Sequence, residues 1–360
     1  MPSAEETYVF RHAVVRDAAY ELQLPTDRES LHGIAARVMI DLHADSLESA
    51  AAEIARHLRL GGSDQELERE FVIKGAQYAN DNFDQHSTIE MLERLVEIGT
   101  DADEMAARQI LFGAYIRFRD DKVRAREHAL GLFRTGRSSG KQGAVSRALS
   151  LLAATRSGAR SVRLNRRAYR IAARAGARFP AGLALGNMGV NLIEYDPRKG
   201  ERILRRAIAL NAKAGNRAGE GYFRGTLAAR MLRSNRLEEA ERLVGEAVAI
   251  LEQIGAKQYL PTVYATQARV LDKQGRLDEA DRVLRHGIEM GRETGIARDI
   301  GALSYERACV CLKRGLHEEA VELWRTARTL FTEWGYLEEL KDQRQSLQQL
   351  CEELYVPMPE

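Results

Sequence analysis

A register of 40 residues in the second half of the sequence constrains the fold more than any other feature. Ala240, Ala280 and Ala320 stand at that interval inside NRLEEA, GRLDEA and GLHEEA. Two further columns keep the same interval, one of small residues and one of glycine: Ala207, Ala247, Gly287, Ala327 and Gly215, Gly255, Gly295, Gly335. Such self-similarity is typical of stacked units, because a single unit of this kind cannot bury its own apolar face.

Each unit carries the pattern of two helices. One face of the second helix is marked by apolar residues spaced i, i+1, i+4, i+5 and i+8: Leu243, Val244, Ala247, Val248, Leu251. This predicts helices from about Glu241 to Gln253 and from Asp281 to Glu293, each ended by the following glycine. The first helix lies before a short Asn/Gly-Arg-Leu turn. The composition agrees, since 6% aromatic residues and 7 prolines do not suit a β-sandwich or barrel.

These columns resemble the tetratricopeptide repeat, which has small residues at fixed places in both helices and glycine at the turn. The unit from 264 to 288 carries them as Ala268, Gly275, Ala280 and Gly287. The family's usual period is 34 residues, and the excess here falls around 255–261 and 295–301. The resemblance implies an all-α fold, a right-handed α-solenoid of helix-turn-helix repeats.

The N-terminal segment does not share the register. It resembles the segment that follows the nucleotide-binding core of bacterial STAND-class signalling ATPases, including those joined to nucleotide cyclases, kinases or LuxR-type regulators. The matching residues are Phe10, Arg11, His12, Val14, Asp17, Ala19, Tyr20, Leu24, Arg28, Leu31, His32 and Ala35. We expect the chain to lack the ATPase core itself.

Four parts are therefore predicted. Residues 1–62 form the STAND-like helical segment, and residues 63–120 form atypical helical repeats. Residues 121–336 form the tetratricopeptide-like array, and residues 337–360 form a capping helix and tail.

No pattern for catalysis, a cofactor or a metal stands out. A phosphate loop needs G-x-x-x-x-G-K-[ST], whereas Gly136 and Gly140 are too close and Gln142 follows Lys141. Cys309 and Cys311 point to different sides of one helix. We expect a non-enzymatic protein without cofactor. Three cysteines and no long apolar run favour a cytoplasmic protein that is not in the membrane.

The net charge of +2 hides a strong asymmetry along the chain. Residues 1–121 carry −12, residues 122–217 carry +18 and residues 218–360 carry −4. Within the basic third, a stripe of arginines lies on one helix face: Arg163, Arg166, Arg167, Arg170 and Arg174. An acidic partner, or charge pairing with the N-terminal third, is the favoured interpretation. A merely solvated face and nucleic acid are the alternatives, the latter less favoured because aromatic residues do not interrupt the stripe.

The inner face of the array is the other candidate surface, because first helices line the inside of such solenoids. Outward-looking columns of these helices contain Tyr222, Thr266, Arg269, Tyr305 and Glu306. Tyrosine and arginine often anchor interfaces.

We therefore favour a protein–protein interaction scaffold or sensor module of a bacterial signalling or transcriptional regulator, which binds a peptide or protein. The alternatives are a nucleic-acid-binding protein that uses residues 122–217, and the repeat half of a split STAND ATPase.

Overall fold

A computed structural model describes residues 13–62, 64–82, 84–118 and 121–359. All regular elements within these residues are helices, with no strand among them. The chain divides into two compact units, Met1–Leu111 and Phe112–Glu360. Phe10, Arg11 and His12 of the STAND-like segment lie outside the described residues.

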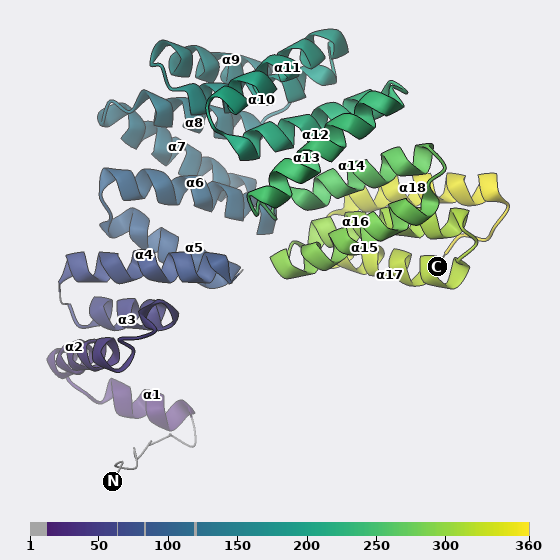
Figure 1. The fold of residues 1–360 in the computed structure, drawn as a ribbon. Helices are drawn as coiled ribbons and strands as arrows, with labels where there is room; N and C mark the ends of the chain where they lie inside the picture. The colour runs from purple at the N-terminus through teal and green to yellow at the C-terminus, as the bar shows by residue number, and fades with distance from the viewer. Residues whose placement is uncertain (1–12, 63, 83, 119–120, 360) are drawn as a thin grey trace. The chain divides into compact units, whose positions relative to one another are not determined.

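The first unit is a run of helices, several of which pack on the next helix along the chain (Figure 1). They are α1 (Ala13–Glu21), α2 (Pro25–Leu42), α3 (Leu47–Leu60), α4 (Gln65–Asp81) and α5 (Gln85–Ile98), followed by α6 (Asp101–Phe118), which crosses the boundary between the units. Helices α4 and α5 both lie within residues 63–120, for which the sequence predicts atypical helical repeats. Both begin at an aspartate side chain that accepts backbone N–H groups, Asp64 for α4 and Asp84 for α5, which satisfies donors that a helix start leaves unpaired.

The second unit contains the 40-residue register as alternating first and second helices. After α7 (Lys122–Ser138), the first helices are α8 (Gln142–Ala154), α10 (Arg178–Ile193), α12 (Arg217–Arg233), α14 (Leu260–Lys273) and α16 (Ala297–Lys313). The second helices are α9 (Gly158–Arg174), α11 (Pro197–Lys213), α13 (Leu237–Gln253), α15 (Leu277–Thr294) and α17 (His317–Glu333). The last helix is α18 (Leu337–Leu354).

The small-residue columns lie where helices touch. Ala240, Ala280 and Ala320 are each 0% exposed. A larger side chain at these positions would hold the two helices of a repeat apart, so the close packing requires a small residue. The glycine that ends each second helix has positive φ, for example 64° at Gly255 and 67° at Gly295, a conformation that is costly for other residues.

The second helices begin about four residues earlier than predicted. Helix α13 starts at Leu237 and α15 at Leu277, because Asn235 and Gly275 already adopt positive φ in the turn. The chain can then re-enter a helix two residues later.

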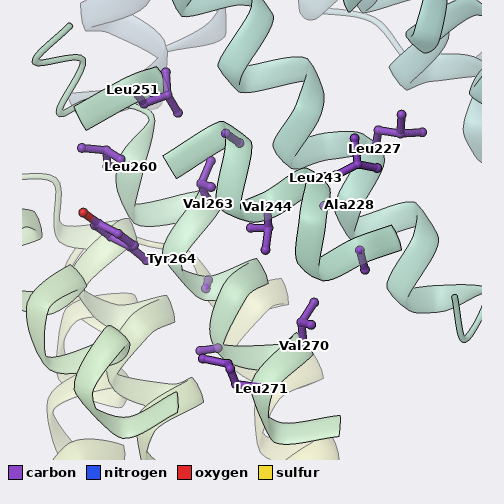
Figure 2. Packing of buried hydrophobic residues seen from close by; sticks show 14 of the residues in the cluster. Leu227, Ala228, Leu243, Val244, Leu251, Leu260, Val263, Tyr264, Val270 and Leu271 are labelled. Atoms are coloured by element: carbon purple, nitrogen blue, oxygen red, sulfur yellow. The ribbon is translucent and has the colours of Figure 1, made fainter. Parts of the chain in front are cut away.

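One continuous core of buried residues extends from α10 to α16, and Figure 2 shows the part of it formed by α12, α13 and α14. Leu227 of α12, Val244 of α13 and Leu271 of α14 are among its buried residues. Each first helix also packs against the next, α12 on α14 and α14 on α16. A continuous surface made only of first helices results, and it carries the candidate site.

The C-terminal helix α18 packs against α16 and α17, and most of its surface is exposed. The division into four parts by sequence remains a prediction. No helix in the described residues has the length and apolar character needed to cross a membrane.

Candidate functional site

A groove of about 480 Å³ lies on the first-helix surface of the second unit. Its walls come from α12, α14, α16 and α18, and its floor is apolar, with Val263, Leu303 and Phe331 nearly fully buried. The 40-residue register places equivalent residues of successive first helices along the groove. Tyr222 and Thr262 share one column of the register, and both line the groove.

Two arginine–glutamate pairs stand in this groove region. The Arg269 guanidinium donates from Nε to Glu306 at 2.8 Å, and Arg298 donates from Nε to Glu339 at 3.0 Å. Desolvation alone would lower the pKa of Arg269, but the attraction of Glu306 outweighs it and raises the pKa. Both arginines are about half exposed, so their remaining N–H groups can reach a ligand.

Asp299 is the unpaired charge in the groove. Its carboxylate forms no hydrogen bond or ion pair with another described residue, although Asp299 follows Arg298 in the first turn of α16. Desolvation raises the pKa of Asp299 to about 6, against the opposing effects of Arg298 and Arg117. This carboxylate therefore titrates close to neutral pH.

The five residues proposed for the inner face have different surroundings. Tyr222, Thr266 and Arg269 line the groove directly, and Glu306 reaches it through its bond to Arg269. Tyr305 is not among the lining residues, because its ring packs edge-on against Trp324 at 6.3 Å between centroids.

Sequence reasoning missed Arg298, Asp299 and Glu339. Arg298 and Asp299 follow the connector around 295–301, where the register differs from the family pattern, and Glu339 belongs to the capping helix. No column in the sequence marks them.

The arginine stripe forms the exposed face of α9. Arg163, Arg166, Arg167, Arg170 and Arg174 are all exposed, while the opposite face of the helix buries Val162, Asn165, Ala168 and others. Among the described residues of the second unit, none of the five arginines is hydrogen-bonded or ion-paired through its guanidinium.

The cysteines are not activated. Burial raises the pKa of the Cys309 thiol to about 12 and that of Cys311 to about 11, so both thiols stay protonated at neutral pH. The described residues contain no group of three or more His, Cys, Asp or Glu side chains placed to hold a metal ion.

No protein-family model and no curated protein matches the sequence. Solved structures match it in three dimensions. The crystal structure of a Rap protein complexed with competence and sporulation factor has a TM-score of 0.54 at 14% identity, covering 92% of this chain and 99% of that chain. The apo form of RapI has a TM-score of 0.51 at 13% identity, covering 73% of this chain and 97% of that chain.

A STAND protein with a tetratricopeptide repeat sensor from Pyrococcus horikoshii has a TM-score of 0.50 at 13% identity. The match covers 90% of this chain and 50% of that chain, so this chain spans about half the length of the STAND protein. The fold is a tetratricopeptide-like α-solenoid. The solenoid predicted from the 40-residue register is thereby confirmed.

Proposed function

We propose that the chain is a non-catalytic interaction module that binds a peptide or an extended protein segment in the groove between α12, α14, α16 and α18. The observation that carries the proposal is the groove itself, with its apolar floor and its rim of Arg–Glu pairs. Its volume lies within the range typical of ligand sites, about 300–1,000 Å³.

The chemistry of the walls suits a polypeptide. The floor can accept an apolar side chain, which supplies affinity through buried area. The Tyr222 and Thr262 side chains, together with the outward N–H groups of Arg269, present donors and acceptors to backbone amides. Asp299 adds a carboxylate that has no ion-pair partner among the described residues, which favours a ligand that places a cationic group beside it.

The similar structures support an interaction role. One of them is a Rap protein in complex with competence and sporulation factor, and another is a STAND protein whose repeat region is described as a sensor. By analogy, the module would belong to a bacterial signalling or transcriptional regulator in the cytoplasm.

The proposal is tested with a random dodecapeptide display library panned on the full chain, followed by fluorescence anisotropy with the selected peptides. Thr262 is exposed on the groove wall, so Thr262→Trp fills the groove without disturbing the core. We expect this variant to weaken peptide binding tenfold or more. Thr326→Trp places the same ring at an exposed position on α17 and is expected to change the affinity less than twofold.

Failure to enrich any peptide above an unselected library would count against the proposal. So would equal affinity of wild type and Thr262→Trp, because the binding surface would then lie elsewhere.

A further inference from the structure

A second surface of the solenoid carries an unusual excess of unpaired positive charge. Helices α9 and α11 both pack against α10 (Figure 1), and each turns a row of arginines away from it. The basic outer face is defined by six exposed side chains, Arg163, Arg166 and Arg170 of α9 and Arg198, Arg202 and Arg206 of α11.

Helices α9 and α11 contain fewer carboxylates beside their arginines than the other second helices do. On α13, Arg242 pairs with Glu246 at 2.5 Å, and on α15, Arg285 pairs with Asp281 at 2.9 Å. Helix α9 contains no acidic residue at all. Helix α11 contains one, Glu201, which is occupied by Arg205 and Arg236.

Unpaired like charges three and four residues apart destabilise a helix by a few tenths of a kcal/mol for each pair. The rows on α9 and α11 therefore cost folding free energy, and within the second unit no described carboxylate pairs with any of the six side chains. A partner that supplies negative charge would remove this repulsion.

The composition of the face favours nucleic acid over an acidic protein. Protein interfaces have cores depleted of charge and enriched in large apolar residues, whereas nucleic-acid interfaces are strongly positive. Here the cations dominate, and the exposed aromatic side chain at the first turn of α9 is Tyr195. It is 66% exposed, and its hydroxyl lies against Gly158, where an added Cβ would be only 3.2 Å away.

Tyr195 comes from the turn before α11, so only the fold brings it to α9. A tyrosine ring beside a row of arginines is the arrangement by which proteins hold a single strand, since bases stack on the ring while cations follow the phosphates. From Arg163 to Arg174 the row on α9 is about 16 Å long at 1.5 Å per residue, which spans several phosphates.

We propose that the basic outer face of α9 and α11 binds single-stranded nucleic acid, through its phosphates and through stacking of a base on Tyr195. This site is separate from the proposed peptide groove and does not depend on it.

The test measures the anisotropy of a fluorescent 20-nucleotide single strand, its duplex and fluorescent polyglutamate with the full chain. We expect the single strand to bind most tightly. With about four phosphate contacts, its affinity should fall about 50-fold between 50 and 200 mM salt, since the salt slope for single strands is about 0.7 for each contact.

Two triple variants distinguish binding at the basic outer face from a general effect of the protein's net charge. Arg166→Glu, Arg170→Glu and Arg202→Glu together should lower the affinity at least 30-fold and flatten the salt slope. A control with the same change in net charge, Arg282→Glu, Arg292→Glu and Arg328→Glu, replaces exposed arginines of the C-terminal repeats and should change affinity less than threefold. Tyr195→Ala should weaken single-strand binding about fivefold and leave duplex binding unchanged. Circular dichroism melts verify that each variant is folded.

The proposal is overturned by an absence of binding at 50 mM salt, or by equal losses in the two triple variants. Polyglutamate binding as tightly as the single strand would also overturn it and would identify an acidic protein as the occupant of the face.

Discussion

Asp281 is a buried carboxylate that binds arginines of neighbouring helices in the C-terminal repeats. Its removal is the sharpest test of how these helices pack together. Its residue is 4% exposed, and it accepts hydrogen bonds from Arg307 at 2.7 Å and from Arg285 at 2.9 Å. Arg314 lies 3.2 Å from the same carboxylate. The arginines come from α15, from α16 and from the turn before α17, so one side chain links neighbouring helices.

The expected cost follows from burial. Removing one partner of a buried ion pair costs about 3–5 kcal/mol, and the side chains of Asp281 and Arg307 are 6% and 10% exposed. Arg285 is half exposed, so water replaces its lost partner at little cost. Arg307 also keeps its bond to Glu319. We therefore expect Asp281→Ala to lower the free energy of unfolding by about 3 kcal/mol, the lower end of that range.

The chain offers a local assay. Its 2 tryptophans are Trp324 and Trp334, in α17 and at its end, so tryptophan fluorescence reports on the C-terminal repeats alone. Because each repeat of a solenoid contacts only its neighbours, the urea midpoint from fluorescence should fall more than the midpoint from circular dichroism at 222 nm.

Asp278→Ala is the matched control, since the Asp278 side chain is 81% exposed and pairs with Arg314 at 2.7 Å. An exposed pair of this kind is worth about 0–1 kcal/mol. Equal losses of stability in the two variants would refute the reasoning from burial.

The pH dependence gives a second check. Burial alone would raise the pKa of Asp281, but the hydrogen bonds from Arg307 and Arg285 outweigh burial and lower it. A carboxylate with a lowered pKa stabilises the fold above its unfolded pKa, about 4, and this contribution is lost as the pH falls further towards the folded pKa. The difference in the free energy of unfolding between wild type and Asp281→Ala should therefore become smaller below about pH 4.

Two further predictions concern other helices. A Cβ at Gly186 would lie 2.1 Å from the Phe223 ring, so Gly186→Ala should destabilise the second unit by about 1–3 kcal/mol. The added Cβ of Gly245→Ala has no atom within 4 Å, so this substitution should stabilise the second unit by about 0.5–1 kcal/mol. Melting temperatures that shift in the same direction for both variants would contradict this. In the first unit, His32 Nδ1 and His57 Nδ1 are 2.8 Å apart, and desolvation lowers the pKa of both rings. Below about pH 6.5 the unfolded chain therefore binds protons more readily than the folded chain, and the fold loses stability. On going from pH 7.5 to 5.5, hydrogen exchange in α1–α3 of the wild type should speed up relative to that of the His57→Gln variant. An identical pH response of the two proteins would exclude the histidine pair as the cause.

Much of the fold could be read from the sequence because its determinants are local. Helix ends follow from glycine, as at Gly255 and Gly295, where positive φ stops the helix. The buried faces follow from the 3.6-residue period, which places Ala240, Leu243, Val244 and Ala247 on one side of α13. The starts of α13 and α15 were placed too late, because the turn is short and the first turn of each helix contains Glu or Asp instead of apolar residues.

The candidate sites depend more on the fold than on the pattern. Tyr222, Thr266 and Arg269 could be proposed from their columns, whereas Asp299 and Arg298 of the same groove could not. The arginine stripe of α9 was visible as spacing, but spacing cannot show whether a carboxylate from another helix neutralises it.

The sequence by itself determined that this chain is a stack of helix pairs, since period, small-residue columns and glycine turns act within one unit and its immediate neighbour. Only the tertiary structure decided which side chains of different repeats meet. The Arg298–Glu339 pair joins residues 41 apart, and Tyr195 meets Gly158 from a separate turn. The physical reason is that such contacts depend on how each helix pair is rotated and shifted against the next, which is set by the packing of many side chains at once and by no single position in the repeat.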